Sequence, residues 1–436
     1  MVAVTGAARG IGHALAVRLA ESPMIGRVVA IDDHRGDAAG VTWRVADVRD
    51  PTRAAARLSE VDVVVHADMD TSAAVDGRQR RAFNVRGAQT VLTAAAAERV
   101  GRVVLVTSAM VYGARPDNPV PLPEDAPLLA DADGSVAGDL LEIEELARRS
   151  RRVNPGTAVT VVRPAAMVGD AVDTLLTRHF EAPRLLIVRG CAPRWQFCHI
   201  DDLVTALELA AAGVLGGDFA VGCDGWLEQA QVEELSGIKS FELPARLTFG
   251  TAQRLHRLGV TPAPAADLRY MVYPWVVDCA ALRGAGWRPA RTNDEALSLL
   301  LAARSGHRAV AGRRIARKEA AITAAAGTAA VIGTAAIVRA ARRRNRTLSI
   351  PNGPGFLPDL RRCATAGGRG AAVPCARRRG GAPGPARYRW TCEPNQADRD
   401  PRHRTVRRRS AGGGGGPGGR RHRAVRRRGP RQRREP

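Results

Sequence analysis

The stretch Met1-Val-Ala-Val-Thr-Gly-Ala-Ala-Arg-Gly-Ile-Gly12 decides how this chain folds. Its apolar start, Val2 to Val4, is typical of a strand; a turn containing Gly6, Gly10 and Gly12 follows, and then an amphipathic helical pattern. A helix start presents unpaired N–H groups and the positive end of the helix dipole, and glycines let the backbone approach an anion without interference from a Cβ atom. The stretch therefore predicts a site for the phosphates of a dinucleotide.

Asp32 ends the second apolar segment, Arg27 to Asp32, twenty residues after Gly12. A carboxylate at this position accepts both hydroxyls of an adenosine ribose, which favours NAD over NADP, and Asp33 adds negative charge against a 2′-phosphate. The alternative is an aspartate that caps a turn; we favour the ribose role because the glycine turn precedes it. The cofactor-binding candidates in the turn itself are Gly6, Ala8, Arg9, Gly10, Ile11 and Gly12.

Strand-like and helix-like segments alternate along the first part of the chain. The apolar segment 61–67 has no polar face, which is typical of a central parallel strand. The alternation predicts an α/β fold with a Rossmann-type doubly wound parallel sheet. Further strands are expected at 41–48, 102–108, 158–164 and 218–221, and helices at 80–98, 140–152, 201–212 and 293–303.

Short motifs follow the glycine turn in a fixed order. They are Asp32, Asp47-Val48, His66-Ala67, Asn84-Val-Arg-Gly87, Thr107-Ser108-Ala-Met-Val-Tyr112-Gly113, Arg163-Pro164, Val168-Gly169 and Phe197-Cys-His199-Ile-Asp201-Asp202. Through them the chain resembles the extended short-chain dehydrogenase/reductase superfamily, in its NAD-dependent epimerase/dehydratase (nucleoside-diphosphate-sugar epimerase-like) branch. The resemblance covers residues 1 to about 304, although the spacing G-x-x-x-G-x-G is that of the shorter, single-domain branch.

The resemblance implies a domain organisation and further cofactor positions. Residues 1–169 would form the NAD(P)-binding Rossmann domain, with 195–222 contributing in part, and 170–304 a small substrate lobe. Asp47 and Val48 would lie at the adenine, and Ala67 along the path of the cofactor. The other cofactor-binding positions that it implies are His66, Asn84, Thr107, Arg163 and Pro164.

The acid/base pair of this family is missing. The resemblance places Ser108 in the serine position and implies a Tyr-x-x-x-Lys near residues 134–140, in which the tyrosine exchanges the hydroxyl proton and the lysine lowers its pKa. The chain instead has Ser-Val-Ala-Gly-Asp-Leu from 135 to 140, and neither of its two lysines, Lys239 and Lys318, follows a tyrosine by four residues. The catalytic candidates are therefore Ser108 and Tyr112, the phenol nearest to it in sequence.

Other acids nearby have structural interpretations. Asp139 is expected to cap a helix, Glu142 to face solvent, and His199 to pack between domains. Five arginines, at 163, 178, 184, 189 and 194, are candidates for a sugar-nucleotide pyrophosphate. The resemblance implies an oxidoreductase or epimerase on a sugar-nucleotide-like substrate with a degenerate acid/base site. The alternative is a non-catalytic dinucleotide-binding sensor or scaffold, membrane-associated through 320–338.

Charge and cysteine content limit the partners. The net charge of +23 is concentrated in residues 345–436, which hold 24 arginines against five acids, whereas 1–344 carry only +4. The seven cysteines show no C-x-x-C pair or Cys/His spacing, so we expect no metal site and reduced thiols in a cytoplasmic protein. With a strand beginning at Val2, we expect no signal peptide. No motif indicates specific nucleic-acid binding, and none sets an oligomeric state.

Two segments beyond residue 312 have other compositions. Residues 313–344 hold an uncharged stretch, 320–338, between basic flanks, which predicts a hydrophobic helix that spans a bilayer, packs on the body of the protein or lies on an anionic surface. Residues 345–436 are rich in Arg, Gly and Pro, which predicts a disordered tail. The tail has two further interpretations: charge-driven contact with nucleic acid or a membrane surface, or translation of a shifted reading frame.

Overall fold

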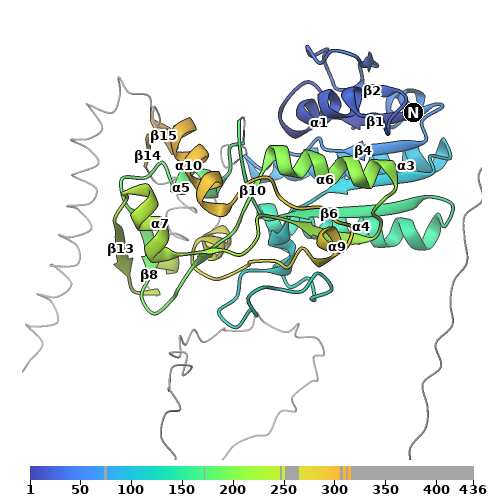
Figure 1. The fold of residues 1–436 in the computed structure, drawn as a ribbon. Helices are drawn as coiled ribbons and strands as arrows, with labels where there is room; N and C mark the ends of the chain where they lie inside the picture. The colour runs from blue at the N-terminus through green and yellow to red at the C-terminus, as the bar shows by residue number, and fades with distance from the viewer. Residues whose placement is uncertain are drawn as a thin grey trace, which may run out of the picture. The chain divides into compact units, whose positions relative to one another are not determined.

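A seven-stranded parallel sheet forms the centre of the fold (Figure 1). The computed structural model describes residues 1–72, 76–170, 172–245, 248–250, 265–304, 308–310 and 313–315, all within the first of two compact units, Met1–Cys392. The strand order is β11-β6-β5-β4-β1-β2-β3 and every pair is parallel. The strands are β1 (Val2–Thr5), β2 (Val28–Ile31), β3 (Thr42–Trp43), β4 (Val63–His66), β5 (Arg102–Val106), β6 (Ala158–Pro164) and β11 (Asp218–Val221).

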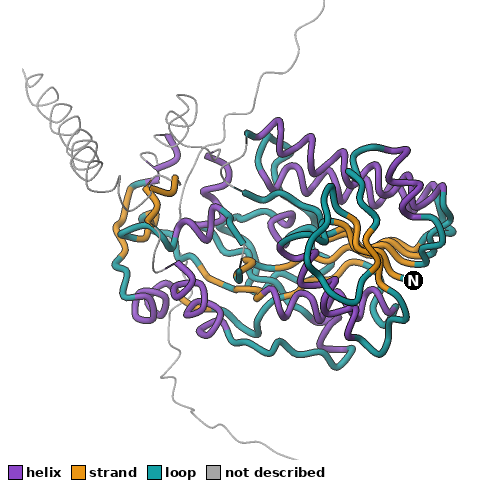
Figure 2. Tube along the Cα trace, turned by 90° about the horizontal axis from the view of Figure 1, so that it is seen from above, coloured by secondary structure: helices purple, strands orange, loops and turns teal. Residues whose placement is uncertain are grey.

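Helices cover both faces of this sheet (Figure 2). One apolar cluster joins the sheet to α1 (Gly10–Glu21) and α6 (Ile200–Ala212), and contains Leu15 and Leu207. A second cluster joins the opposite face to α2 (Pro51–Leu58), α3 (Gly77–Ala97) and α4 (Val136–Val153). Burial on both faces explains why the strands are continuous apolar runs, and it confirms the predicted α/β class with a doubly wound sheet.

The predicted end of one strand and the predicted start of one helix were wrong, and nearby turn and capping residues explain both. The strand expected at 41–48 pairs only at Thr42–Trp43, because the chain turns at Asp47 and Pro51 then begins α2. The helix expected from residue 140 begins at Val136, because Ser135 caps it by accepting the Gly138 N–H. Asp139 is therefore not the cap but lies in the first turn, fully buried.

The remaining elements form short sheets and helices. Strand β7 (Ala166–Val168) pairs with β10 (Phe197–His199), β8 (Leu185–Val188) with β13 (Ser240–Leu243), and β9 (Arg194–Trp195) with β12 (Leu227–Glu228). A last pair joins β14 (Arg308–Val310) and β15 (Arg313–Ile315). The helical elements are η1 (Ala109–Tyr112), α5 (Leu175–His179), α7 (Gln229–Ser236), η2 (Ala265–Met271), α9 (Ala280–Gly284) and α10 (Asn293–Arg304).

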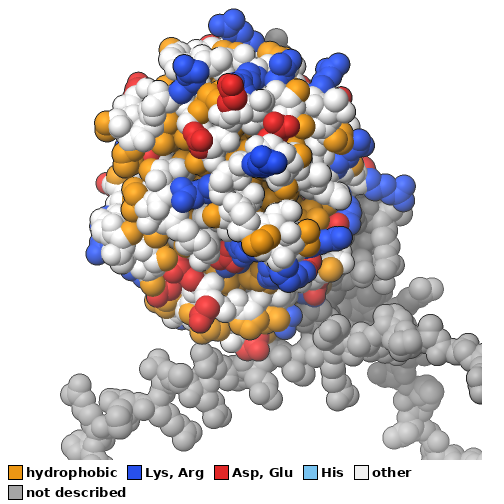
Figure 3. Space-filling model, turned by 90° about the vertical axis from the view of Figure 1, so that its right-hand side faces the viewer, with side chains coloured by type: hydrophobic (Ala, Val, Ile, Leu, Met, Phe, Trp, Pro, Cys, Tyr) orange, Lys and Arg blue, Asp and Glu red, His pale blue; other side chains and the backbone are white. Residues whose placement is uncertain are grey.

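On the face drawn in Figure 3, acidic and basic side chains are interspersed with apolar ones, in keeping with the small net charge of 1–344. Within the described ranges, no helix combines the length and apolar character needed to cross a bilayer. The stretch 320–338 and the tail 345–436 lie outside the described residues, so their interpretations stay predictions.

Candidate functional site

The carboxyl ends of four neighbouring strands bring the predicted residues to one edge of the sheet. Asp32 follows β2, Gly6 follows β1, Ala67 follows β4 and Ser108 lies just beyond β5. The chain runs from β1 outward to β2 and β3 and then returns to β4 on the other side of β1. Such a change of direction opens a crevice at the carboxyl ends, where doubly wound sheets bind their ligands.

The glycine turn between β1 and α1 has a geometry that only glycine satisfies. Gly6 adopts φ +69° and Gly10 φ +56°. A Cβ on Gly12 would lie 2.2 Å from the carbonyl oxygen of Gly6, which is too close for any other residue. Residue Arg9 caps α1 without a side-chain hydrogen bond, and the first turn holds no acid. No side chain of α1 therefore neutralises the positive end of the helix dipole, which favours the binding of an anion there.

Asp32 supports the turn from beside it. Its side chain is 3% exposed, and its two oxygens accept the N–H of Ala8 at 2.9 Å and of Asp33 at 2.7 Å. It therefore caps the turn, as the alternative interpretation held. A carboxylate has about four acceptor positions, so two such bonds leave capacity for ribose hydroxyls.

The expected adenine residues lie at the turn after β3. Arg49 donates from Nε to Asp47 Oδ1 at 2.7 Å, and this hydrogen bond lowers the pKa of Asp47. The Arg49 guanidinium also lies over the Phe83 ring, 4.8 Å from its centroid. Val48 is 4% exposed and packs into the second apolar cluster. The turn after β3 thus carries an ionised Asp47 at neutral pH, paired with Arg49.

Asp68 is a residue of this region that the motifs did not single out. It follows Ala67, and a Cβ on Gly6 would lie 2.8 Å from the Asp68 Cα. Burial raises the pKa of Asp68 to about 7, and the charge of Asp32 acts in the same direction. Its sequence signal was an acid directly after His66-Ala67, beside the phosphate turn.

His66 and Asn84 make hydrogen bonds to neighbouring strand and loop residues. His66 Nδ1 lies 2.8 Å from the Thr5 hydroxyl, and burial lowers the pKa of His66 to about 4, so the ring is neutral. The Asn84 amide accepts the Asp70 N–H and donates to the Asp70 carbonyl, both at 2.8 Å. Asn84 thereby fixes the loop that follows β4.

Arg163, near the end of β6, belongs to a buried ion-pair network with Glu144 of α4. It donates to both oxygens of Glu144, from Nε at 2.9 Å and from a terminal nitrogen at 2.8 Å. Thr107 donates to the same carboxylate at 3.0 Å. Tyr112 accepts from Arg163 at 3.0 Å and donates to the Glu124 carbonyl at 2.8 Å. Burial raises the pKa of Tyr112 to about 12, so its phenol is neither free nor acidic.

A mostly apolar cavity of about 60 Å³ adjoins Ser108. Ser108 donates to the Pro164 carbonyl at 3.3 Å and accepts the Met110 N–H. Val136 and Leu140 line the same cavity from the first turns of α4, four residues apart. They lie in the stretch to which the family resemblance assigns the tyrosine and the lysine. Tyr112 is not among the residues that line this cavity.

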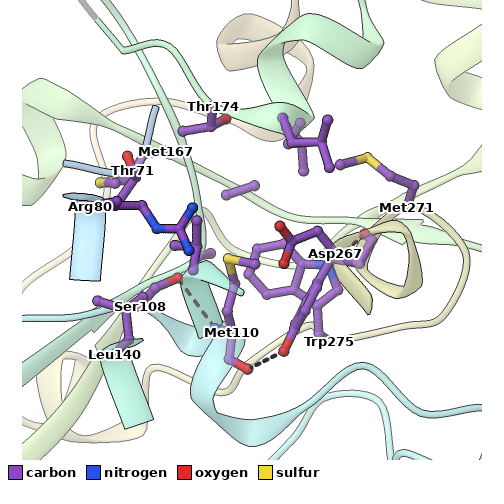
Figure 4. Close-up of a pocket in the computed structure, with 16 residues that line it drawn as sticks. Thr71, Arg80, Ser108, Met110, Leu140, Met167, Thr174, Asp267, Met271 and Trp275 are labelled. Atoms are coloured by element: carbon purple, nitrogen blue, oxygen red, sulfur yellow. Dashed lines mark hydrogen bonds between the residues drawn. The ribbon is translucent and has the colours of Figure 1, made fainter. Parts of the chain in front are cut away.

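Two charged side chains enter the cavity, and sequence reasoning missed both. Arg80 comes from α3 and Asp267 from η2, and Figure 4 shows the two groups directed toward one another. Arg80 also donates to Asp139 Oδ2 at 2.9 Å, and both are buried. Asp267 is 4% exposed, and its Oδ1 has no hydrogen-bond partner within the described residues. Neither residue belongs to a motif, so only the fold reveals them.

The other acids and arginines considered from sequence have different partners. Glu142 pairs with Arg81, and His199 accepts the Asp201 N–H at the start of α6. The arginines pair on the surface or in the core: Arg178 with Asp173, Arg189 with Glu242 and Arg194 with Glu228. None of these residues lines the cavity beside Ser108.

Comparisons with known proteins agree with this architecture. A family model described as the NAD dependent epimerase/dehydratase family matches residues 2–222. The chain is 33% identical over 307 residues to the uncharacterized protein Mb0513 of Mycobacterium bovis, spanning 68% of this chain and 82% of that protein. It is 30% identical over 239 residues to the 4-hydroxy-2-methyl-3-oxo-4-farnesyl-3,4-dihydroquinoline-1-oxide ketoreductase of Stigmatella aurantiaca, spanning 50% and 68% of the two chains.

A solved structure shows the same fold. The UDP-glucose 4-epimerase of Thermus thermophilus, in complex with NAD, superposes with a TM-score of 0.53 at 19% identity. The match covers 70% of this chain and 99% of that one.

Proposed function

We propose that this chain, which belongs to the NAD-dependent epimerase/dehydratase family, binds NAD in preference to NADP and acts as an oxidoreductase or epimerase with a degenerate acid/base site. One observation carries the proposal: a buried carboxylate, Asp32, lies beside a glycine turn at the crevice of a doubly wound sheet. Phosphates held by the turn would direct the adenosine ribose toward Asp32.

The residues present fit a dinucleotide. The turn from Gly6 to Gly12 offers backbone N–H groups and no Cβ atom where a pyrophosphate would approach. Asp32 would hold the ribose, Asp47 and Val48 the adenine, and Ala67 the path toward Ser108. When bound, NAD would supply a hydride acceptor next to the cavity, and the chain would orient the substrate and exclude water.

The preference for NAD rests on charge. A 2′-phosphate would lie against the buried Asp32 and the half-exposed Asp33, where the described residues place two carboxylates side by side. Two like charges at such close range disfavour the phosphorylated cofactor, whereas a free ribose hydroxyl donates to the same oxygens.

For the substrate we propose a sugar nucleotide or a related hydroxyl compound. Support comes from the Thermus thermophilus neighbour, whose name states that it acts on UDP-glucose. The cavity adds a restriction: Met110, Val136, Leu140 and Trp275 present apolar walls to the reacting end. Unpaired hydroxyls against such walls cost free energy, so a deoxygenated sugar or a cyclic ketone fits better than a fully hydroxylated ring.

A second candidate function is a non-catalytic dinucleotide sensor or scaffold. It is favoured by the aliphatic side chains of Val136 and Leu140, which line the cavity in the stretch 134–140 where the family resemblance implies the tyrosine and the lysine. Cofactor binding does not depend on these two positions, so occupancy without turnover is chemically coherent.

A turnover screen of the full-length chain distinguishes the two functions. The protein is loaded with NAD⁺ and mixed with UDP-glucose and other UDP-sugars, while absorbance at the NADH band and epimer composition are followed. Turnover supports the enzyme; binding of NAD with no turnover of any UDP-sugar supports the sensor. If the chain binds neither NAD nor NADP, both functions are excluded.

A further inference from the structure

The cavity beside Ser108 is lined by a buried acid, Asp267, one oxygen of which has no hydrogen-bond partner among the described residues. Asp267 is 4% exposed, and no described residue makes a hydrogen bond to its Oδ1. The carboxyl group comes from η2, whereas Ser108 comes from the end of β5 and Arg80 from α3, so three distant segments converge on one space. In Figure 4 the Asp267 carboxyl group points into the cavity.

A buried polar atom without a hydrogen-bond partner lowers the stability of the folded protein. Leaving such a group unsatisfied costs about 1 to 3 kcal/mol. Two polar neighbours have partners of their own: Tyr270 donates to the Met110 carbonyl at 2.8 Å, and Arg80 donates to Asp139 and to the Gly134 carbonyl. Among the described residues, Asp267 Oδ1 thus keeps an unused acceptor position at the wall of the cavity.

We propose that Asp267 is the acid/base residue of this site, giving or taking the proton of a substrate hydroxyl in place of the missing tyrosine. The inference rests on the proposed oxidoreductase function. On oxidation, the O–H bond of the substrate breaks and its proton goes to the Asp267 carboxylate. The C–H bond of the same carbon breaks and its electron pair leaves as hydride to the nicotinamide dinucleotide, forming C=O. Reduction reverses each transfer.

The surroundings of Asp267 suit this task. Burial raises the pKa of Asp267 to about 7, so both protonation states are accessible at neutral pH. A proton donor works best when its pKa lies near the working pH. The acids Asp133 and Asp139 raise this pKa further, and the Arg80 guanidinium lowers it. Tyr270 and Arg269 are the other titratable groups on η2 near Asp267.

Arg80 acts as a positioning residue in this proposal. Its guanidinium is held by Asp139 at 2.9 Å and by the Gly134 carbonyl at 2.7 Å, so it is fixed before a ligand arrives. Opposite Asp267, its positive charge stabilises the carboxylate form. Removing that charge should raise the Asp267 pKa without removing the acid itself.

The first test measures the ionisation of Asp267 without any substrate. Full-length protein carrying ¹³C-labelled aspartate is titrated by NMR, and the Asp267 signal is identified by its absence in Asp267→Asn. We expect a midpoint near 7 and an upward shift in Arg80→Met. A midpoint near 4, the usual value of an aspartate, overturns the proposal, because the group could not then supply a proton at neutral pH.

The second test measures turnover with a stated probe. NADH oxidation is followed with cyclohexanone, acetophenone and phenanthrenequinone as carbonyl acceptors between pH 5.5 and 8.5. We expect a wild-type rate that falls as pH rises through about 7, and a loss of roughly 100-fold or more in Asp267→Asn with no such pH dependence. The matched control is Asp117→Asn, an exposed aspartate with no contact to the cavity, which should keep the wild-type rate.

The outcomes separate this inference from the proposed function. Calorimetry with NADH should give the same affinity for wild type and Asp267→Asn, because Asp32 and the glycine turn hold the cofactor. A wild type that does not bind NADH contradicts the proposed function. The NMR midpoint still reports the pKa of Asp267 in that case. Two results overturn the acid/base role of Asp267. One is an Asp267→Asn variant that keeps the wild-type rate and pH profile. The other is a wild type that binds NADH and reduces none of the three carbonyls.

Discussion

Val136 and Leu140 lie one helical turn apart on α4, and both line the cavity that contains Ser108. Both lie in the stretch 134–140, where the resemblance to the family implies the tyrosine and the lysine. Neither aliphatic side chain can transfer a proton, and the glycine turn and Asp32 lie elsewhere in the fold. We therefore expect cofactor binding and proton transfer to depend on separate residues, so that each can be tested alone.

The glycine turn should not tolerate a side chain at Gly12. We expect Gly12→Ala to abolish NAD binding, because its Cβ would lie 2.2 Å from the Gly6 carbonyl oxygen and force the turn open. Gly26→Ala is the matched control, since no atom lies within 4 Å of its added Cβ. Calorimetric titration with NAD compares the two. Unchanged affinity in Gly12→Ala would mean that the dinucleotide binds elsewhere.

Affinity for NAD should depend on pH through Asp68. Burial raises the pKa of Asp68 to about 7, so the carboxyl group is mainly neutral below that pH and charged above it. The groups around it are Asp32 and Asp33, which raise this pKa, and Arg9 and Arg49, which lower it. A charged carboxylate repels the pyrophosphate, so we expect NAD to bind several-fold more weakly at about pH 8 than at about pH 6.

Asp68→Asn provides the control for this pH effect. The neutral amide should bind NAD under the alkaline condition as tightly as the wild type does under the acidic one, with little change between the two. If wild type and variant show the same pH dependence, another group is responsible.

The buried pair of Arg163 and Glu144 should contribute to stability and not to cofactor affinity. Arg163→Met leaves the Glu144 carboxylate buried without its partner, so we expect the free energy of unfolding to fall by about 3 to 5 kcal/mol. Arg152→Met removes an exposed arginine that pairs at 3.7 Å with Glu145, and should change stability by less than about 0.5 kcal/mol. Urea denaturation and NAD titration measure both properties. Weakened NAD binding with unchanged stability would show that Arg163 contacts the cofactor.

The Tyr112 hydroxyl should have a structural effect only. Tyr112→Phe removes the group that bridges Arg163 and the Glu124 carbonyl, so we expect a loss of about 1 to 2 kcal/mol in stability. Carbonyl reduction with NADH should keep its rate and pH profile, because the phenol does not line the cavity. A variant that folds with wild-type stability but loses turnover would return Tyr112 to the list of catalytic residues.

The sequence singled out the glycine turn and Asp32 but neither Asp267 nor Arg80, and the reason is physical. Gly6, Gly12 and Asp32 are recognisable because a strand, a turn and a helix place them at a fixed spacing in one short stretch. Asp267 and Arg80 lie far apart in the chain and belong to no motif, so only the fold, which brings η2 and α3 to one cavity, reveals them. Ser135 caps α4 by accepting the Gly138 N–H, whereas Asp139 pairs with Arg80, a contact across 59 residues that no local pattern encodes.

An NAD site in which Asp32 selects the unphosphorylated ribose is tested most directly by the affinity ratio of NAD to NADP. Calorimetric titrations of the full-length wild type, of Asp32→Asn and of the exposed control Asp37→Asn give this ratio. We predict that wild type and Asp37→Asn bind NAD at least about tenfold more tightly than NADP, and that Asp32→Asn loses most of that preference. Equal affinity of the wild type for both cofactors, or a preference that survives in Asp32→Asn, would contradict the account.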